Sequence, residues 1–310
     1  MLIVMLTAAF INFVGDLVFV GRAGAAGAAM ATVLSQYAAL AMFLQFLRCR
    51  PLKDEGNESS SRGILHQKFR TRDFFREAKC KRTVKEVAKF FVPVTTTAIG
   101  RVSGYIAMSH VVSSAFGTID MAAQQIVLSF FLCFIPMCDS LNLTAQSFVP
   151  GIHEYKKDLK LRAEVMKETT KNFMKAGSYF GLAISALVAT LPAVINCFTR
   201  DAAVITSVTS TLPYLWIFCL FAGVVCSGEG LLLGTKDLNF LKNSFSVFFF
   251  VIPFCMLRIK KAILVEGQRH IKLAAVWRIF AVYQVFRSCL WMFRLRVLSQ
   301  KDYAKANEDA

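Results

Sequence analysis

Two charged residues, Arg101 and Asp139, lie in the middle of long apolar stretches of this chain. Arg101 interrupts the stretch 90–116, and Asp139 interrupts the stretch 121–150. A charged side chain at the centre of a bilayer costs about 2.5–3.5 kcal/mol on insertion scales, so it is kept mostly where it faces a partner or a wet cavity. The pattern therefore indicates a polar site at membrane depth.

Three amide side chains accompany Asp139 on the same predicted helix. At 100° per residue, Gln125, Asp139 and Gln146 fall within about 60° of one face, and Asn142 extends that stripe. Pro136 allows a kink that exposes backbone carbonyls to a cavity. Either the stripe lines a cavity in which Asp139 binds a cation or titrates, or it is a hydrogen-bonded cluster that fixes helix packing. We favour the first interpretation for Asp139 and leave both open for the amides.

Other charges are predicted to meet this stripe from different helices. Arg101 lies too deep in its stretch for its side chain to reach an interface easily. We expect it to pair with Asp139 or Glu229 or to attract an anionic solute, with a permanent structural ion pair as the alternative. Glu229 is either a functional carboxylate or one that is solvated at the membrane interface. In the last apolar stretch, Arg287 shares a face with Gln284, and we expect both to line the bundle.

The composition predicts that membrane-spanning helices position these residues. The mean hydropathy of +0.51, the 55% of hydrophobic residues and the 29 Phe are far from those of a soluble domain of 310 residues. Apolar segments of about 20 residues, each able to span a core of roughly 30 Å, recur along the chain. The predicted fold is an all-α integral membrane protein with about eight transmembrane helices, at 2–20, 25–47, 90–113, 121–149, 174–198, 203–234, 240–257 and 273–293.

The net charge of +16 is placed in a way that argues against nucleic-acid binding. Residues 48–89 contain 13 Lys or Arg against six acidic residues, and residues 153–175 contain seven against four. Both segments follow an even-numbered predicted span, so both lie on one side, which the positive-inside rule makes the inner side. The segment 258–272 carries five basic residues on the other side. It is either an interfacial basic segment or a sign that the seventh span is misplaced.

The sequence contains no pattern typical of covalent or metal chemistry. Its nine Cys and four His show no zinc or redox spacing. It contains no Gly-rich phosphate loop and no nucleophile elbow. We therefore predict a protein that is not an enzyme, with no metal site and no cofactor.

Four segments, taken in order, resemble the MATE (multidrug and toxic compound extrusion) transporter family. Residues 27–37 read GAAMATVLSQY and are similar to the sixth helix of that family. Residues 121–126 (MAAQQI) and 144–150 (TAQSFVP) are similar to the eighth helix, closest to its plant plastid-type branch. Residues 229–238 (EGLLLGTKDL) resemble the end of the tenth helix. The last apolar stretch resembles the twelfth helix at Trp277, Gln284 and Arg287.

This resemblance implies a fold of two six-helix lobes around a central cavity, which alternates between inward-open and outward-open states. The chain would begin at the fifth helix and would be an N-terminally truncated member, without the acidic residue of the first helix. The implied organisation is a two-helix remnant of the N-lobe at 1–47, a basic inter-lobe loop at 48–89, a six-helix C-lobe at 90–293 and a polar tail at 294–310. Glu229 matches the acidic position of the tenth helix, which is implicated in cation coupling.

The function implied is that of a secondary antiporter, or a fragment of one, exporting small organic solutes in exchange for H+ or Na+. Arg101 and the plant-branch resemblance favour an anionic or aromatic solute. The expected partners are the lipid bilayer, the solute and, for a truncated chain, a second copy of itself. The protein would be multi-pass, in the plastid envelope or the plasma membrane. The alternatives are a lipid-linked oligosaccharide flippase of the same superfamily, or a membrane receptor or scaffold that uses the basic inner loops.

Overall fold

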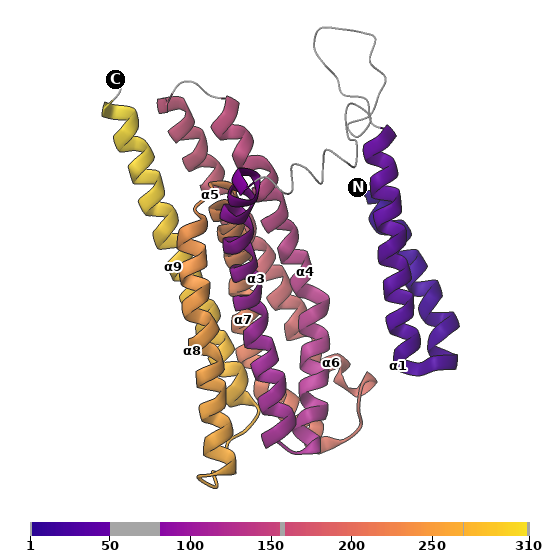
Figure 1. Cartoon of the computed structure of the whole chain (residues 1–310). Helices are drawn as coiled ribbons and strands as arrows, with labels where there is room; N and C mark the ends of the chain where they lie inside the picture. Colours follow the sequence, from indigo (N-terminus) through magenta and orange to yellow (C-terminus); the bar gives the residue numbers. More distant parts are fainter. Residues whose placement is uncertain (1, 50–80, 156–158, 269, 309–310) are drawn as a thin grey trace. The chain divides into compact units, whose positions relative to one another are not determined.

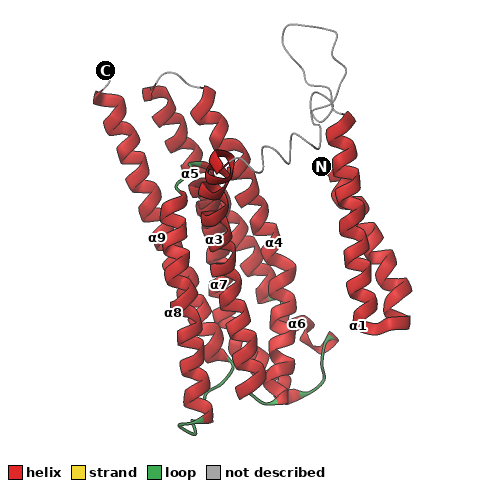
Figure 2. Ribbon diagram, viewed as in Figure 1, coloured by secondary structure: helices red, strands yellow, loops and turns green. Residues whose placement is uncertain are grey.

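The computed structural model describes residues 2–49, 81–155, 159–268 and 270–308, and within these ranges every regular element is a helix (Figures 1 and 2). The chain divides into two compact units, Met1–Val87 and Ala88–Ala310. Most of the predicted basic loop, residues 50–80, lies outside the described residues.

The first unit contains α1 (Leu2–Cys49), which folds back on itself at Gly24 (Figure 1). Gly24 has φ 54° and ψ −132°, a backbone conformation that residues with a side chain rarely adopt. The two arms of α1 meet closely, because a Cβ added to Gly27 would lie 2.2 Å from the carbonyl oxygen of Phe19. The arms coincide with the predicted spans 2–20 and 25–47.

In its described residues, the second unit contains six long helices and two short ones. They are α3 (Lys81–Ala115, which starts in the first unit), α4 (Thr118–Tyr155), α5 (Leu159–Ala189), α6 (Leu191–Val194), the 3-10 helix η1 (Ile195–Cys197), α7 (Ala202–Gly234), α8 (Leu238–Leu264) and α9 (Ala274–Glu308). Five of the six predicted spans each lie in one long helix to within a residue, whereas the span 174–198 runs from α5 through α6 and η1. In addition, α3 begins inside the predicted loop and α9 runs on through the predicted tail. Both extensions are rich in strong helix formers such as Lys, Arg, Leu and Ala.

α7 is the central helix of the second unit and packs against α4, α5 and α9. Glycines bring α5 and α7 together. A Cβ added to Gly181 would lie 2.2 Å from the carbonyl oxygen of Leu220, and one added to Gly223 would lie 2.1 Å from that of Gly177. Small residues at such contacts are typical of helices that associate in membranes, where close packing replaces the hydrophobic effect.

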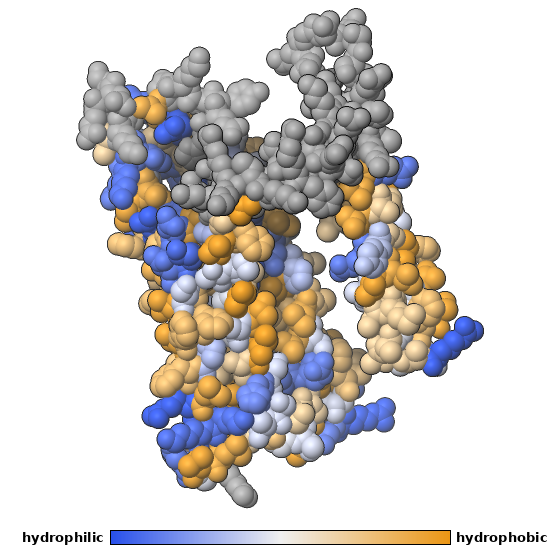
Figure 3. All heavy atoms as spheres, in the orientation of Figure 1, coloured by the Kyte–Doolittle hydropathy of each residue, from blue (hydrophilic) through white to orange (hydrophobic). Residues whose placement is uncertain are grey.

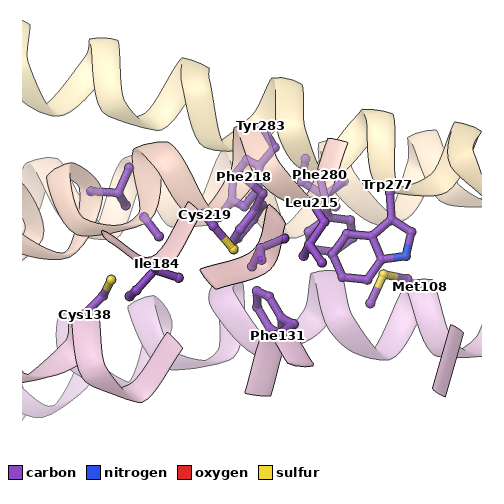
Figure 4. Packing of buried hydrophobic residues seen from close by; sticks show 14 of the residues in the cluster. Met108, Phe131, Cys138, Ile184, Leu215, Phe218, Cys219, Trp277, Phe280 and Tyr283 are labelled. Atoms are coloured by element: carbon purple, nitrogen blue, oxygen red, sulfur yellow. The ribbon is translucent and has the colours of Figure 1, made fainter. Parts of the chain in front are cut away.

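Aromatic side chains fill the space where α4, α7 and α9 meet (Figure 4). The ring of Phe131 lies 5.2 Å from that of Phe218 and 5.9 Å from that of Trp277, both edge-on, and Phe280 contacts the same cluster. Edge-to-face pairs add to the stabilisation that burial provides. This cluster fixes the spacing of the three helices that carry Asp139, Glu229 and Arg287.

The outer surface of the described helices is largely apolar. Phe250 and Phe293 are 70% and 65% exposed, and Figure 3 shows apolar side chains over much of the visible face of the second unit, with polar ones gathered toward its ends. Four helical stretches among the described residues are long and apolar enough to cross a membrane, namely Ile3–Phe46, Thr118–Ile152, Leu159–Cys197 and Ala202–Gly234. These features support a multi-pass membrane protein. The total of about eight spans stays a prediction.

Candidate functional site

The carboxylate of Glu229 lies between two arginines inside the second unit. Its Oε2 accepts a 2.7 Å hydrogen bond from Nη2 of Arg287, and its Oε1 accepts one from Nη2 of Arg101. Glu229 is 2% exposed and Arg287 is 5% exposed. The three side chains come from α7, α9 and α3, so a single carboxylate joins three helices. The alternative interpretation of Glu229 as a solvated interfacial carboxylate is wrong, because the side chain is buried.

The sequence around Glu229 explains how three helices approach it. A Cβ added to Gly230 would lie 2.5 Å from the carbonyl oxygen of Asn142 on α4, and one added to Gly228 would lie 3.1 Å from Cβ of Trp291 on α9. The two flanking glycines therefore allow α4 and α9 to close on α7. Gly100, beside Arg101, allows α3 to approach α8 closely. A Cβ added there would lie 2.7 Å from the carbonyl oxygen of Phe245 on α8.

Asp139 shares Arg101 with Glu229. Its Oδ1 lies 3.9 Å from Nη1 of Arg101 and accepts a weak hydrogen bond from the thiol of Cys226 at 3.5 Å. The side chains of Asp139 and Arg101 are 40% and 33% exposed. Asp139 is thus held loosely and is accessible, whereas Glu229 is held tightly and is enclosed.

Arg287 is fixed by aromatic rings as well as by Glu229. Its guanidinium carbon lies 5.1 Å from the ring centre of Tyr283, 5.3 Å from that of Phe245 and 5.9 Å from that of Trp291. A guanidinium is attracted to ring faces at these distances. Gln284 accepts a long hydrogen bond of 3.4 Å from Nη1 of Arg287. The arginine is therefore held in place before any ligand arrives.

These residues border a cavity of about 360 Å³. Its polar wall contains all four charged residues described above together with Gln284, and its apolar wall includes Phe131, Phe218 and Ile135. Tyr105 adds a ring that stacks on Phe280, with centroids 5.3 Å apart. Two arginines face two carboxylates, so the four charges balance. A buried charge that lost its partner would be strongly destabilising, and the balance removes that penalty.

The structure brings together five of the eight predicted site residues and separates the other three from the cavity. The five are Arg101, Asp139, Glu229, Gln284 and Arg287. Asn142 is buried and accepts a 2.8 Å hydrogen bond from Gln146, and neither lines the cavity. Gln125 is exposed on α4 and does not line it either. The cavity borders α4 only between Leu128 and Asp139. Of the two interpretations left open for the amides, the Asn142–Gln146 hydrogen bond fits the packing cluster better than the cavity wall.

The buried amide near the other end of α4 is Gln124 rather than Gln125. Its Oε1 accepts a 2.8 Å hydrogen bond from Nε1 of Trp277, which joins α4 to α9 within the aromatic cluster. The adjacent glutamines in the sequence are the only sign of this contact. The periodicity of one helix does not decide whether Gln124 or Gln125 contacts Trp277, which is 153 positions away in the sequence from Gln124.

A second ion pair joins α9 to the turn between α7 and α8. Arg294 donates from Nε to Oδ2 of Asp237 at 2.6 Å and from Nη2 to Oδ1 at 3.1 Å, and its guanidinium carbon lies 4.8 Å from the ring centre of Phe240. The hydrogen bonds to Asp237 raise the pKa of Arg294 above its ordinary value. These two parallel hydrogen bonds between Arg294 and Asp237 fix the turn between α7 and α8 against α9. Within the described ranges, no group of His, Cys, Asp and Glu is arranged to hold a metal ion.

No protein-family model matches the chain, and no characterised protein matches its sequence. Its fold, however, is similar to those of solved transporters. An outward-facing multidrug resistance MATE family transporter of the MOP superfamily matches with a TM-score of 0.68 and 15% identity, over 97% of this chain and 62% of that one. A MATE structure in the straight conformation matches with a TM-score of 0.65 and 15% identity, over 97% and 63%. A MOP superfamily transporter from Pyrococcus furiosus matches with a TM-score of 0.63 and 16% identity, over 97% and 62%.

The chain thus spans a little over three fifths of the length of these structures. At this level of identity the likeness concerns the fold. The near-complete coverage of the chain agrees with it. The chain has the fold of the corresponding part of the MATE transporters of the MOP superfamily.

Proposed function

We propose that the chain is part of a secondary membrane transporter that exports small organic solutes in exchange for H+ or Na+. One observation carries this proposal: balanced charges at the wall of a cavity, on helices with apolar outer surfaces. Charged residues at membrane depth that face a cavity are typical of substrate and ion pathways. The fold likeness favours a transporter over an enzyme.

Asp139 and Glu229 have different proposed roles. Glu229 holds Arg101 and Arg287 in place, because it is enclosed and contacts both. Asp139 binds the coupling cation, because it is accessible and its arginine partner is 3.9 Å away and already engaged by Glu229. A proton or sodium ion on Asp139 would weaken its attraction to Arg101 without breaking the buried pair.

The proposed solute is small and aromatic. A cavity of about 360 Å³ is at the lower end of the range of about 300–1,000 Å³ typical of small-molecule sites. Tyr105 is only partly buried and offers a ring surface, and the part-exposed side chains of Arg101 and Asp139 offer polar contacts. A molecule with one aromatic ring and one polar group matches both walls.

Exchange imposes a condition on this site. The cation and the solute must weaken each other's binding, and the coupling is reciprocal. A solute that itself contacts Asp139 meets this condition, because a proton or sodium ion would occupy the same carboxylate. A solute bound only to Arg101 would instead bind more tightly when the cation is present, because neutralising Asp139 leaves Arg101 free to contact the solute.

The test compares two probes of matched size and opposite charge, 2-phenylethylammonium and 3-phenylpropionate. Their binding to the purified chain in nanodiscs is measured by calorimetry at mildly acidic and mildly alkaline pH. Exchange predicts that acid weakens binding of the ammonium probe in the native chain and has no such effect in Asp139→Asn. Asp120→Asn, a change on the same helix but away from the cavity, is the matched control. Binding of neither probe would refute the proposed solute site.

A second candidate, co-transport of an organic anion with a cation, is supported by a separate observation. The Nε atoms of Arg101 and Arg287 are buried and have no hydrogen-bond partner in the described part of the chain. The transporter from Pyrococcus furiosus has a binding pocket of reversed polarity, which suggests a different function for that protein. Binding of 3-phenylpropionate that is strengthened by acid would favour this candidate over exchange.

A further inference from the structure

A groove of about 740 Å³ lies between the start of α5 and the end of α9, on the second unit and separate from the cavity. Both helix segments are at the same end of the bundle (Figure 1). The lining from α5 is Lys167, Thr170, Lys171 and Met174, and that from α9 is Met292, Leu295, Arg296, Ser299, Gln300 and Tyr303. No residue in this set lines the cavity.

The groove carries unbalanced positive charge. Among the residues that the structure describes, its lining contains Lys167, Lys171 and Arg296 and no acidic residue. Hydroxyl and amide groups of the lining add hydrogen-bond donors beside these charges. Nζ of Lys167 lies 5.2 Å from the ring centre of Tyr303, a contact that holds one ammonium group against the wall. Three cations with neighbouring donors form a site suited to a phosphate group.

The groove is also divided by polarity along its length. Lys167 and Lys171 precede the apolar part of α5, and Arg296 follows the apolar part of α9. Met174, Met292 and Leu295 lie on the side that continues into the apolar parts of both helices. The basic segment 153–175 is predicted to be on the inner side, so the groove would cross the inner interface of the membrane.

We propose that this groove binds an anionic phospholipid, with the phosphate headgroup on Lys167, Lys171 and Arg296 and part of one acyl chain on Met174, Met292 and Leu295. Charge complementarity selects the headgroup, and the apolar base selects a lipid over a soluble anion. Basic sites between helices near the inner surface are where such lipids are recognised. The inference requires that the chain lies in a bilayer and does not depend on transport.

The experiment measures lipid binding to the full 310-residue chain by native mass spectrometry. Phosphatidylglycerol and phosphatidylcholine with identical acyl chains are added in equal amounts. We expect roughly tenfold higher occupancy of the first lipid bound by phosphatidylglycerol than by phosphatidylcholine. The triple variant Lys167→Gln, Lys171→Gln, Arg296→Gln should lower this preference to less than about twofold. Inorganic phosphate in excess should not displace the lipid.

The matched control removes the same charge from the same end of the bundle but outside the groove: Arg162→Gln, Lys175→Gln, Lys301→Gln. The control variant should keep the preference. If both variants lost the preference for phosphatidylglycerol equally, the preference would come from the overall positive charge of this end and not from a site, and the proposal would be overturned. A native chain without this preference would overturn it as well. Displacement by inorganic phosphate would overturn the lipid in favour of a soluble anion.

A second measurement tests the site without mutation. Phosphatidylglycerol with a photoactivatable group on its acyl chain is cross-linked to the native chain, and the labelled peptides are identified. We expect labels on peptides that contain Met174, Met292 or Leu295. Labels confined to other helices would overturn the proposal, even if the triple variant binds less lipid.

Discussion

The cavity and the groove of the second unit both contain arginine, but their charges are arranged in opposite ways. At the cavity, Arg101 and Arg287 meet Glu229 and Asp139, and the charges cancel. At the groove, three cations line one surface, and the described part of its lining contains no acidic residue. Charges deep in a low-dielectric bundle need partners to be retained, whereas charges near water do not. The balanced cluster should therefore govern stability, and the unbalanced groove should govern what binds from outside.

The strongest test of this comparison removes the shared carboxylate. Glu229→Gln leaves Arg287 buried without an anion and should lower the free energy of unfolding by about 3–5 kcal/mol. Denaturant titration in detergent micelles measures this change. The control is Glu164→Gln, an exposed carboxylate on α5, which should change stability by less than about 0.5 kcal/mol. Equal effects of the two variants would show that the cluster has no special role in stability.

A second test concerns the close packing that holds α7 in the cluster. Gly181→Ala would place a Cβ against the carbonyl oxygen of Leu220, and we expect a loss of about 1–3 kcal/mol in the free energy of unfolding. Gly151→Ala is the matched control, because an added Cβ there meets no atom within 4 Å. That control should be neutral or stabilising by up to about 1 kcal/mol. A tolerated Gly181→Ala would mean that α5 and α7 can separate without loss.

The third test compares the two carboxylates of the cavity, Asp139 and Glu229. Asp139→Asn should change the free energy of unfolding by less than about 1 kcal/mol, because Asp139 is accessible and only loosely paired. In a full-length transporter that contains this chain, it should nevertheless reduce the pH or sodium dependence of solute efflux from vesicles. Efflux from Asp139→Asn that responds to the ion gradient as that of the native transporter does would rule out this carboxylate as the cation site.

The smallest effect on stability is expected at the groove. The triple variant of Lys167, Lys171 and Arg296 to Gln should change the free energy of unfolding by less than about 0.5 kcal/mol in lipid-free detergent. Lipid preference should instead fall steeply as salt rises from about 0.1 M to about 1 M, since the screening length shortens from about 10 Å to about 3 Å. The thermal stability set by the enclosed Arg287–Glu229 pair should respond weakly to the same salt. A matching salt response at both regions would remove the distinction between them.

The sequence predicted the helices well because each apolar run is long and ends in polar residues. It also predicted that Arg101 would pair with Asp139 or Glu229, and the structure shows contacts to both. The prediction was less successful for Gln125. Helical periodicity gives the face on which a side chain lies, but not how far a neighbouring helix or a cavity extends along that face.

The contacts that periodicity cannot supply join residues far apart in the chain. Two examples are the hydrogen bond from Trp277 to Gln124 and the pair of hydrogen bonds from Arg294 to Asp237. Both depend on how α9 is placed against α4 and α7. The groove was not predicted because α9 was expected to end at its apolar part. Its polar extension carries Arg296 and Tyr303, and only a helix that continues to Glu308 brings them beside α5.

The glycine contacts between α5 and α7 have a mechanical consequence. With backbone against backbone at Gly177, Gly181 and Gly223, these two helices have no side-chain layer through which to slide. The two helices should move together as one rigid body. The amides at their contact should show the slowest hydrogen exchange in the molecule. Any motion that opens or closes the cavity must then come from its other walls. Of the cavity cations in the described part of the chain, Arg101 on α3 is the one that contacts two carboxylates, and its helix is not part of this packed pair, so a tilt of α3 would change its 3.9 Å distance to Asp139 first.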